Sequence, residues 1–308
     1  MSLYQKYRPT RLKQVKGNEK IKNVLATMLA EKETCPHAFL FHGETGCGKT
    51  TLARITATML GCDIESSDYS EINFADLRGI DTIREIIKQS QFLPFKGDCR
   101  VWVLDECQKM TGDAQNALLK ILEDAPYHVY FILCTTEPQK LISTIRGRCS
   151  QFQVQPLGHD DLESLLVKIT NAEIGDVLAE EIYAEIIESS KGHVRNAIQI
   201  LEQVLSVSEE DQLEVARKGS EELKQAIDLC RVLINPKSTW RDVQHILTDL
   251  KTVEPEKVRR AVIGYASSTL LNKDFPLCGL VLEQFMDNFY DNGFPQLVLA
   301  CYSVIKQK

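Results

Sequence analysis

The sequence predicts an α/β core, with a parallel sheet covered by helices, followed by a small helical lid and a C-terminal helical bundle. Residues 1–156 alternate short apolar runs with longer amphipathic segments. Near-continuous apolar strands that are separated by helices indicate a parallel sheet covered on both faces. After Pro156 the strand pattern ends and only helical periodicity continues. We therefore expect three domains, comprising residues 1–156, 157–207 and 208–308.

Short runs rich in β-branched and aromatic residues define the predicted strands. These strands are residues 38–42, 101–105, 129–134 and 151–154, with 70–74 as a weaker fifth. Between them, apolar residues recur at the helical spacing of about 3.6 residues. The predicted helices are residues 50–60, 80–90 and 113–123. Strands that alternate with helices along one chain favour βαβ units, whose strands run parallel.

The second half of the chain shows helical patterns only. Apolar side chains recur there at helical spacing, on one face of each segment. These segments are residues 162–169, 182–187 and 194–205 before the polar stretch 207–211, and residues 240–250 and 277–285 after it. Because each apolar face must be buried against another element, we expect two groups of packed helices.

The composition is that of an ordinary globular protein. Of the 308 residues, 44% are hydrophobic, 26% are charged and 7% are aromatic. No apolar run approaches the roughly 20 residues that are required to cross a bilayer. Residues 1–8 lack the apolar segment of a secretory signal. We expect a cytoplasmic protein, in the host cytoplasm if the source is viral, with no membrane partner.

The net charge of −7 restricts how nucleic acid can bind. Phosphate neutralisation by Lys and Arg supplies most of the affinity of DNA-binding proteins, so an acidic chain is not expected to grip DNA over its whole surface. Any DNA site must therefore be local. Residues 1–22 are one local basic segment, in which seven Lys and Arg residues accompany the single acid Glu19.

Ten cysteines are spread along the chain, and no two of them have C-x-x-C spacing. Structural zinc requires paired, closely spaced ligands, so no zinc site is expected. Several cysteines lie in apolar runs, as Cys134 does in residues 129–134. A thiol in that setting behaves as a small hydrophobic side chain. We expect reduced thiols.

Residues 43–50 read GETGCGKT, a complete G-x-x-x-x-G-K-[ST] phosphate-binding loop. The loop follows a predicted strand and opens a predicted helix, which is the structural context that the motif needs. Glycines let backbone N–H groups curl around phosphates, and the helix directs the positive end of its dipole at the anion. We expect Lys49 to reach the β- and γ-phosphates of ATP and the Thr50 hydroxyl to ligate Mg²⁺. The alternative is a chance glycine loop.

Residues 101–106 read VWVLDE, an apolar strand that ends in two acids. A P-loop ATPase needs this arrangement, because one carboxylate holds Mg²⁺ and a second polarises the attacking water. Asp105 is assigned to the metal and Glu106 to the water. Acid pairs at strand ends are common, so the assignment depends on the phosphate-binding loop upstream. Glu106 predicts hydrolysis rather than nucleotide binding alone.

Six further runs stand out: DECQ at 105–108, NALLKILEDAP at 116–126, TTEPQKL at 135–141, RGRC at 146–149, QKYRP at 5–9 and GHVRNA at 192–197. Together they resemble the AAA+ clamp-loader ATPase family, in its bacterial gamma/tau form and in the small subunit of replication factor C. The likeness covers residues 4–205 in order and spacing. It implies an AAA+ core, a helical lid and, in residues 208–308, a collar domain that joins the subunits of an oligomer.

The resemblance also implies roles for single residues. Thr136 is the expected sensor hydroxyl, between the acidic strand end and the γ-phosphate, with Thr135 as the alternative. Arg195 would contact the γ-phosphate from the lid of the same subunit. Arg148 would act as an arginine finger in the site of the neighbouring subunit, a contribution of ~10³–10⁵ in rate. The expected catalytic residues are Lys49, Asp105, Glu106, Thr136, Arg148 and Arg195. The expected nucleotide contacts are Tyr7, Arg8, Pro9, Gly43, Glu44, Thr45, Gly46, Cys47, Gly48, Lys49, Thr50 and Thr51, of which the first three would border the adenine.

Each of these roles has a plainer alternative. Arg148 can be a surface cation, and Arg195 can lie on a solvated helix face. The two threonines at 135–136 can simply cap a strand, and Tyr7 can belong to the core.

Three departures from the family pattern are visible, of which Cys107, where a small or apolar residue is usual, is expected to be harmless. Gly147 stands where the family shows a serine beside the finger arginine, although the arginine itself is kept. The cysteine-rich zinc insertion of many bacterial relatives is missing, which removes zinc from the prediction. This compact form favours a bacteriophage source, and a bacterial source stays open.

Residues 75–84 match the segment by which clamp loaders hold DNA phosphates. Arg78 and Arg84 are the expected DNA contacts there, with N–H groups of the helix N-terminus assisting. The alternative is an exposed amphipathic helix. No segment resembles a module that reads base edges, so sequence-specific recognition is not expected.

The leading hypothesis is the ATPase subunit of a clamp loader. ATP binding would order the subunits of a homo- or hetero-oligomer, expected to be a pentamer, open the sliding clamp and grip primer–template DNA. Hydrolysis would then release the closed clamp. The alternatives are a nucleotide-binding scaffold without turnover and another AAA+ DNA motor. Glu106 and Arg148 argue against the scaffold, and the pattern of residues 136–149 argues against other motors.

Overall fold

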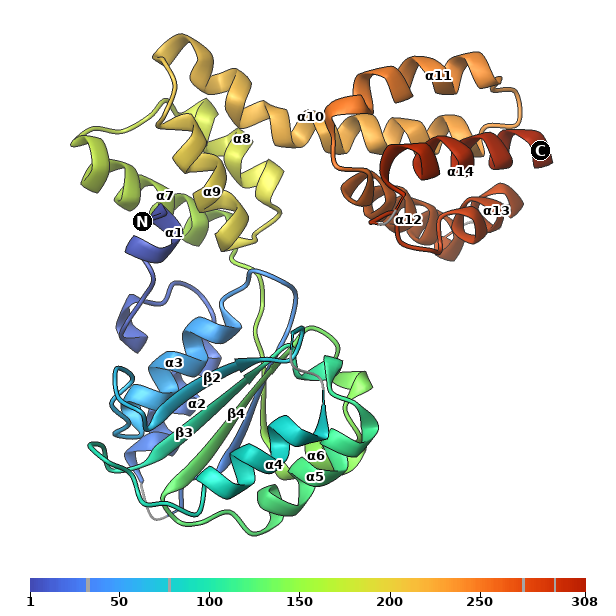
Figure 1. The fold of residues 1–308 in the computed structure, drawn as a ribbon. Coiled ribbons are helices and arrows are strands. Elements are labelled where there is room, and N and C mark those ends of the chain that lie inside the picture. The colour runs from blue at the N-terminus through green and yellow to red at the C-terminus, as the bar shows by residue number, and fades with distance from the viewer. Residues whose placement is uncertain (32–33, 77–78, 273–274, 291) are drawn as a thin grey trace. The chain divides into compact units, whose positions relative to one another are not determined.

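The computed structural model describes residues 1–308 apart from 32–33, 77–78, 273–274 and 291, and in 218–224 it describes only the backbone. The described chain forms two compact units, Met1–Ser206 and Val207–Lys308. The first unit contains a sheet with helices around it and a further group of helices, and the second contains helices alone (Figure 1). Each unit has its own apolar core.

A five-stranded sheet lies at the centre of the first unit, in the order β2-β3-β4-β1-β5. Its strands are β1 (Ala38–His42), β2 (Tyr69–Asn73), β3 (Arg100–Asp105), β4 (Val129–Thr135) and β5 (Ser150–Gln153). Every neighbouring pair is parallel, so the carboxyl ends of the strands meet at one edge. The predicted α/β class is confirmed, and the weakly predicted strand at 70–74 is part of the sheet.

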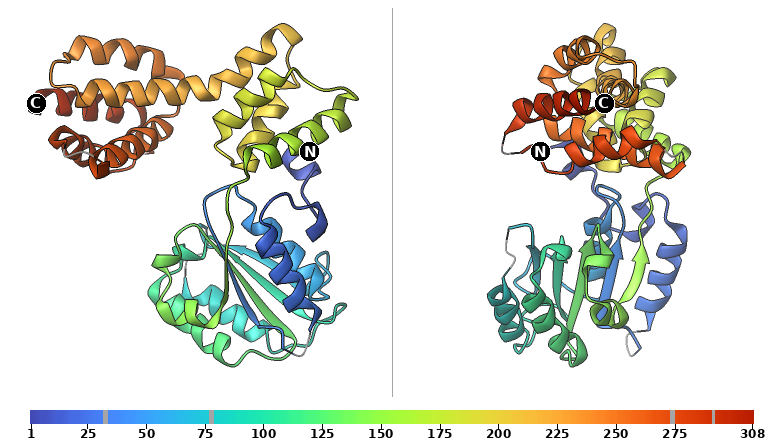
Figure 2. Two further views of the ribbon diagram at one scale, coloured as in Figure 1. Left: turned by 180° about the vertical axis from the view of Figure 1, so that it is seen from behind. Right: turned by 90° about the vertical axis from the view of Figure 1, so that its right-hand side faces the viewer.

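Helices cover both faces of this sheet. They are α2 (Glu19–Ala30), α3 (Lys49–Met59), α4 (Ile80–Gln89), α5 (Gly112–Glu123) and α6 (Ser143–Arg148). Successive strand residues face opposite sides, so Leu104 and Leu133 join a buried cluster with α4, α5 and α6. Val103 and Ile132 join a second cluster, with α2 and α3, on the other face. Figure 2 shows the sheet between these two helical layers.

A group of lid helices follows the sheet in the first unit. It consists of α7 (His159–Ile174), α8 (Glu180–Ser190) and α9 (Val194–Val204), and the short amino-terminal helix α1 (Leu3–Lys6) packs against it. Leu3 is buried, and its N–H donates to Glu202 Oε1 at 3.1 Å. The amino-terminal segment therefore begins on the lid helices and continues, through the 3₁₀ helix η1 (Leu12–Gln14), to α2.

Short 3₁₀ helices follow two strands at the carboxyl edge of the sheet. These are η2 (Cys107–Lys109), after β3, and η3 (Pro138–Lys140), after β4. The buried side chain of Gln115 joins them: its Nε2 donates to Met110 O at 3.4 Å and to Lys140 O at 3.3 Å. Its Oε1 accepts the Ile142 N–H at 2.9 Å. The segments that leave β3 and β4 are thus held side by side.

The second unit is a helical bundle. Its elements are α10 (Glu209–Ile234), α11 (Trp240–Asp249), η4 (Leu250–Thr252), α12 (Pro255–Asn272), α13 (Pro276–Gln284) and α14 (Gly293–Gln307). One buried carboxylate interrupts its apolar core, because Glu256 is only 3% exposed. Arg259 donates to both oxygens of Glu256, at 2.8 and 2.7 Å, and the Phe289 N–H donates at 3.0 Å. These bonds replace the water that burial removes. Among the described residues, no helix is both long and apolar enough to cross a membrane.

Candidate nucleotide site

The glycine-rich loop at residues 43–50 connects β1 to α3. Gly43 and Gly46 have φ angles of +151° and +80°, which L side chains rarely adopt. A Cβ atom on Gly43 would lie 2.2 Å from Val154 O, closer than real contacts allow. The Gly43 N–H also donates to the carbonyl oxygen of Thr135 at 3.2 Å, which ties the loop to the end of β4. Glycine is therefore required for the loop to turn at the sheet edge.

Lys49 and Thr50 begin α3 directly after this loop. Lys49 is 6% exposed, and its Nζ donates to the carbonyl oxygens of Gly43 at 3.0 Å and Glu44 at 2.8 Å. Its ammonium group therefore lies within the curve of the loop, where helix N–H groups favour an anion. Thr50 Oγ1 donates to Asp105 Oδ2 at 2.8 Å. A hydroxyl and a carboxylate this close are hard oxygen ligands, so the two residues fit Mg²⁺.

Glu106 follows β3 in an unusual backbone conformation. Its φ and ψ angles are +51° and +36°, in the left-handed region that non-glycine residues seldom occupy. Its N–H donates to Asp105 Oδ1 at 2.9 Å, and its Oε2 accepts a hydrogen bond from Gln108 Nε2 at 2.5 Å. Strained backbone of this kind clusters at functional sites because the surrounding contacts must maintain it.

Gln108 is the centre of a buried hydrogen-bond network. The residue is 7% exposed. Besides Glu106, its Nε2 contacts Thr136 Oγ1 at 3.0 Å, and its Oε1 accepts from Thr135 Oγ1 at 2.8 Å. Gln108 lies in the DECQ run at 105–108, but nothing in the sequence indicated a role for it. Its partners Thr135 and Thr136 are 27 and 28 positions away, so no local pattern indicates these contacts.

The network distinguishes the two threonines at the end of β4. Thr135 is fully buried, donates its single hydroxyl proton to Gln108, and accepts the Glu137 N–H at 3.0 Å. Thr136 accepts from Gln108, so its own hydroxyl proton remains available for another acceptor. Thr136 thus fits the sensor role that the sequence analysis preferred, and Thr135 fits a structural one.

Tyr4 joins Arg195 of the lid helices to Arg8 of the amino-terminal segment. The Arg195 guanidinium lies 4.9 Å from the Tyr4 ring centroid, and its Nη2 donates to the Tyr4 hydroxyl at 3.3 Å. Arg8 donates to the same hydroxyl at 3.2 Å and, through Nε, to Thr51 Oγ1 at 3.2 Å. The Arg195 N–H reaches the carbonyl of Gly46 at 3.5 Å. The predicted lid arginine therefore lies beside the phosphate-binding loop.

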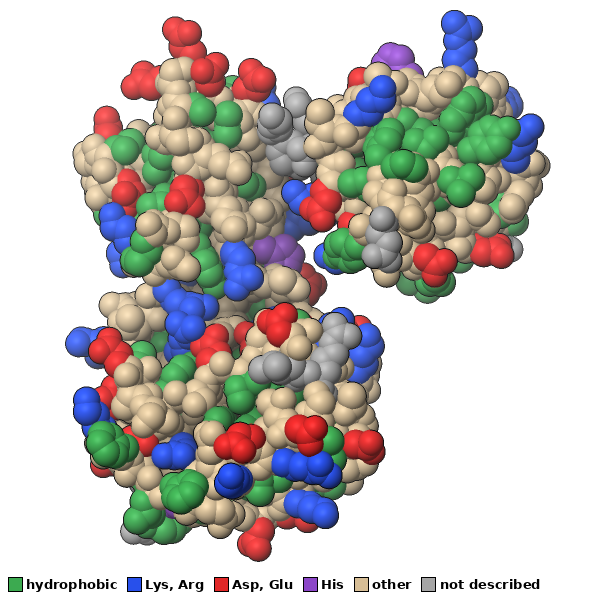
Figure 3. All heavy atoms as spheres, viewed as in Figure 1, with side chains coloured by type: hydrophobic (Ala, Val, Ile, Leu, Met, Phe, Trp, Pro, Cys, Tyr) green, Lys and Arg blue, Asp and Glu red, His purple; other side chains and the backbone are tan. Residues whose placement is uncertain are grey.

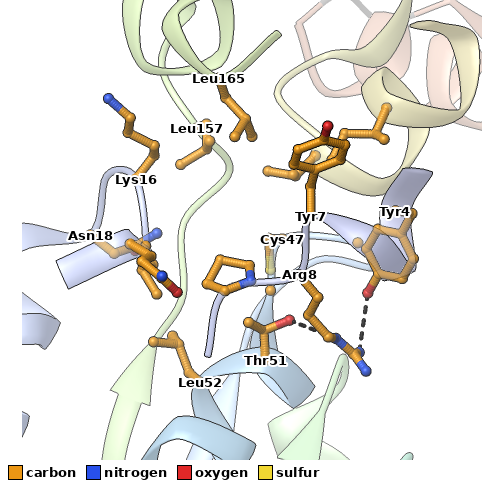
Figure 4. A pocket seen from close by; sticks show the side chains of 17 residues that line it. Tyr4, Tyr7, Arg8, Lys16, Asn18, Cys47, Thr51, Leu52, Leu157 and Leu165 are labelled. Atoms are coloured by element: carbon orange, nitrogen blue, oxygen red, sulfur yellow. Dashed lines mark hydrogen bonds between the residues drawn. The ribbon is translucent and has the colours of Figure 1, made fainter. Parts of the chain in front are cut away.

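An open pocket of about 630 Å³ lies between the amino-terminal segment, the start of α3 and the lid helices. Figure 4 shows Tyr7 and Leu165 toward the lid helices and Thr51 and Leu52 on α3. The predicted adenine and phosphate contacts that line the pocket together are Tyr7, Arg8, Pro9, Gly46, Cys47, Gly48 and Thr51.

Comparison with known proteins agrees with this geometry. The family model described as DNA polymerase III, delta subunit matches residues 64–158. The replication factor C small subunit of Methanococcus maripaludis is 38% identical over 216 residues, which cover 70% of this chain and 68% of that protein. The chain belongs to the AAA+ clamp-loader family. The resemblance noted in the sequence is therefore confirmed.

This clamp-loader chain is also similar to longer bacterial proteins. DNA polymerase III subunit tau of Bacillus subtilis is 35% identical over 227 residues, which cover 67% of this chain and 40% of that protein. The gamma/tau subunit of Mycoplasma pneumoniae is 32% identical, with 70% of this chain and 34% of that protein covered. The chain thus spans about a third to two-fifths of the length of these relatives.

A solved structure has a related fold. The RuvB Holliday junction branch migration motor of Thermotoga maritima superposes with a TM-score of 0.60 and 20% sequence identity, and covers 74% of this chain and 80% of that chain. At this identity the likeness concerns the fold alone. The AAA+ class predicted for the clamp-loader chain is confirmed.

Arg148, the predicted arginine finger, ends α6 and is not joined to the network around Gln108. Its guanidinium forms an ion pair with Glu123 and donates to the carbonyl of Thr144 at 3.2 Å. The side chains of Arg148 and Glu123 are 37% and 46% exposed. Neither residue lines the nucleotide pocket of this clamp-loader chain.

Of the two predicted DNA contacts, Arg78 lies outside the described residues. Arg84 lies on α4 with its side chain 66% exposed, and it forms an ion pair with Asp81 at 2.9 Å. Basic and acidic side chains are interspersed on the face of the first unit that Figure 3 presents. An exposed ion pair contributes only about 0–1 kcal/mol, so Arg84 can exchange Asp81 for a phosphate at little cost.

A surface that the sequence analysis missed lies at the amino edge of the sheet. Phe92, Leu93 and Phe95, between α4 and β3, are 61%, 63% and 81% exposed, and Tyr127, before β4, is 78% exposed. Three of these four side chains are aromatic, and we call the group the aromatic surface. Because β3 and β4 begin at this edge, it is opposite to the edge that bears the phosphate-binding loop. The available signal was the run FLPF directly after the predicted helix 80–90.

Asp68 holds the backbone of this segment. Its buried carboxylate accepts the N–H groups of Phe95 at 2.7 Å, Lys96 at 2.7 Å and Gly97 at 3.2 Å, and Arg100 Nη2 lies 3.5 Å away. Burial by itself raises the pKa of the Asp68 carboxyl, but the three N–H groups and Arg100 outweigh it, so the pKa is lowered. Asp68 therefore fixes the backbone at Phe95, the most exposed member of the aromatic surface.

All ten cysteines are buried thiols. Burial raises the pKa of Cys149 and of Cys230 to about 12, so both thiols remain protonated and unreactive near neutral pH. In the parts of the chain that the structure describes, no three His, Cys, Asp or Glu side chains come together as a metal site.

Proposed function

We propose that the chain is the ATPase subunit of a DNA polymerase clamp loader and that it binds ATP and Mg²⁺ at the carboxyl edge of its sheet. The observation that supports this most directly is the 2.8 Å hydrogen bond between Thr50 and Asp105. Lys49 precedes the first of these residues and Glu106 follows the second. Metal ligands, a phosphate-binding ammonium group and a general-base candidate therefore converge on one place.

Each of these residues has a distinct part. Lys49 and the N–H groups of residues 43–50 bind the β- and γ-phosphates, while the nucleoside occupies the pocket. When bound by Thr50 and Asp105, Mg²⁺ supplies positive charge that stabilises the phosphate oxygens during transfer. Glu106 orients the attacking water and accepts its proton, a type of contribution that is usually worth about 10²–10⁴ in rate.

Three further residues contact the γ-phosphate. Thr136 approaches it from the end of β4 with its available hydroxyl proton, and Arg195 approaches it from the lid helices. Arg148 approaches it from the neighbouring subunit. Arg148 is partly exposed and does not line its own pocket, which supports this role. Activity then depends on assembly, because no subunit completes its own site.

The oligomer, expected to be a pentamer of identical or different subunits, joins through residues 208–308. Leu299 and Tyr302 of α14 are 63% and 41% exposed there, which supports a protein contact on this helix. ATP binding orders the ring, opens the sliding clamp and grips primer–template DNA, in part through Arg84. Hydrolysis weakens the grip and releases the closed clamp on DNA.

The aromatic surface is assigned to the sliding clamp. Its four apolar side chains are exposed, and the backbone at Phe95 is already held by Asp68, so little backbone entropy is lost there when a partner buries the side chain. It lies at the sheet edge opposite to the nucleotide. The clamp and ATP can therefore be bound by one subunit at the same time.

ATPase assays of the assembled complex test the central proposal. We expect clamp and primed DNA to stimulate turnover of the wild type, Lys49→Ala to abolish nucleotide binding, and Arg148→Ala to bind ATP but lose the stimulation. Normal stimulated turnover of Arg148→Ala would contradict the role of the finger in a neighbouring site. Tight ATP binding without turnover under any condition would instead support a nucleotide-binding scaffold.

Clamp binding in the presence of ATP tests the aromatic surface. Phe95→Ser is expected to weaken clamp affinity at least tenfold. Truncating an anchor residue of an interface often costs about 2 kcal/mol or more of binding free energy. Ile174→Ser removes a side chain that is 50% exposed on α7 and is the matched control. Equal clamp affinity of the two variants would exclude the aromatic surface as the docking site.

A further inference from the structure

The hydrogen bonds of the Gln108 side-chain amide fix which way the amide is oriented. Its Nε2 has two N–H groups, and these contact Glu106 Oε2 at 2.5 Å and Thr136 Oγ1 at 3.0 Å. Its Oε1 accepts from Thr135 Oγ1 at 2.8 Å. The orientation follows from chemistry, because a carboxylate can only accept and must therefore face the N–H side of the amide.

We propose that Gln108 is a positioning residue that links the sensor hydroxyl of Thr136 to the carboxylate of Glu106. The inference rests on the proposed ATPase function and extends it to a residue that contacts neither the phosphate-binding loop nor the pocket. Gln108 holds Glu106 Oε2, which leaves Oε1 to accept a hydrogen bond from water. The same amide directs the hydroxyl proton of Thr136 away from Gln108.

Two features of the fold support this link. Glu106 has a left-handed backbone, which persists only where neighbouring contacts maintain it. Among the described residues, Gln108 is the side chain that hydrogen-bonds to the Glu106 carboxylate. Gln108 is also 7% exposed, so its amide has no competing bulk water. A buried and fully paired network of this kind strengthens each of its bonds.

The direction of the bonds predicts how the γ-phosphate is sensed. A hydroxyl that donates to an anion becomes a better acceptor, because hydrogen bonds in a chain polarise one another. A phosphate oxygen that accepts the Thr136 proton therefore strengthens the bond from Gln108 to Thr136. The amide is then fixed in the orientation that holds Glu106. ATP, but not ADP, would complete this alignment.

The test uses the assembled complex and two variants of similar size to glutamine. Gln108→Met removes all three bonds, and Gln108→Glu keeps an acceptor for Thr135 but loses both donors. We expect each to lower kcat about 10- to 100-fold, with the affinity for ADP within about twofold of wild type. The preference for a non-hydrolysable ATP analogue over ADP should fall by about threefold to tenfold.

A double-mutant cycle separates positioning from a general loss of stability. Thr136→Val removes the sensor hydroxyl, and the effect of Gln108→Met on kcat should be several-fold smaller in that background, because both residues act through one bond. Additive effects would overturn the link. Turnover of Gln108→Met within about threefold of wild type would overturn it as well, as would an equal loss of ADP and ATP binding.

The ATP-over-ADP preference also keeps the two proposals apart. If the wild type binds ATP without turnover, the ATPase proposal fails, and the binding comparison still decides the role of Gln108. An unchanged preference in Gln108→Met would then overturn the inference. A reduced preference would retain the link between Gln108 and Thr136 as a nucleotide sensor.

Discussion

Thr50 donates a hydrogen bond to the carboxylate of Asp105 across 55 positions of the sequence, with an Oγ1–Oδ2 distance of 2.8 Å. Thr50 lies in the first turn of α3 and Asp105 ends β3, so the bond joins a helix and a strand at the carboxyl edge of the sheet. Parallel strands bring such residues together because all their ends of one kind lie on one side.

The Thr50–Asp105 pair predicts how magnesium dependence responds to substitution. Thr50→Val keeps the shape of the side chain but removes the oxygen ligand, and we expect the Mg²⁺ concentration for half-maximal ATP turnover to rise at least about tenfold. Thr50→Ser retains the hydroxyl and should remain within about threefold of wild type. The measurement is a Mg²⁺ titration of turnover at fixed ATP. The same midpoint for all three proteins would remove Thr50 from the metal site.

We predict that Tyr4, which lies outside the motifs found in the sequence, contributes to ATP binding through Arg195 and Arg8. Burial alone raises the pKa of the Tyr4 phenol, but the donated hydrogen bond and charge of Arg195, together with Arg8, outweigh it and lower the pKa. Tyr4→Phe keeps the ring under Arg195 and removes the shared acceptor. We expect ATP affinity to fall about three- to tenfold and ADP affinity to change less, as measured by calorimetry. Tyr4→Ala should lower ATP affinity further, because the cation–π contact with Arg195 is also lost. If the Tyr4→Phe protein binds ATP with the affinity of the wild type, the Tyr4 hydroxyl does not position Arg195.

The contacts of Asp68 predict that the stability of the first unit depends on this one buried carboxylate. Asp68→Asn removes the charge that three backbone N–H groups and Arg100 share, and we expect a loss of about 2–4 kcal/mol in the unfolding free energy of the first unit. Because the folded pKa of Asp68 is lowered, its stabilisation is present above the unfolded pKa, about 3.9, and is lost as pH falls through the lower folded value. The measurement is urea unfolding, by fluorescence, in a Trp240→Phe background, where Trp102 is the remaining tryptophan.

Asp160→Asn is the control for that experiment, since the Asp160 side chain is fully exposed and should shift stability by no more than about 0.5 kcal/mol. Comparable stability of the Asp68 and Asp160 variants would contradict the role of Asp68.

Glu256 predicts acid sensitivity of the second unit. Hydrogen bonds from Arg259 lower the pKa of the Glu256 carboxyl to about 2 from an ordinary value of 4.5, against the opposing effect of burial. The stabilisation of about 3 kcal/mol that this shift represents is fully present above the unfolded pKa and is lost as pH falls from about 4.5 toward 2. Glu256→Gln should lose a similar amount at pH 7. Acid unfolding of a Trp102→Phe protein, in which Trp240 is the remaining tryptophan, measures the second unit alone.

The exposed neighbour Glu254 provides the matched control for this prediction. Glu254→Gln removes the same charge two positions away and should leave the acid midpoint unchanged. If both variants shift the midpoint equally, net charge rather than the Glu256–Arg259 pair governs acid stability.

Several parts of the site could be predicted because their chemistry is contiguous in the chain. The loop at residues 43–50 contains its own glycines, lysine and hydroxyl, and the strand at 101–106 carries both acids at its end. The order of strands and helices could likewise be predicted, because the spacing of apolar residues differs between the two kinds of element. The AAA+ family resemblance then named Arg195 and Thr136, and the structure places both at the same edge as the loop.

The amino-acid sequence by itself determined the fold class, the phosphate-binding loop and the acidic strand end, because each depends on residues that are neighbours along the chain. Only the tertiary structure decided that Gln108 joins Glu106 to the two threonines, that Tyr4 holds Arg195, and that Asp68 holds the backbone at Phe95. Those relationships join segments separated by up to 191 positions. They arise from how helices pack on the sheet, and local periodicity contains no information about which polar side chains such packing will bring together.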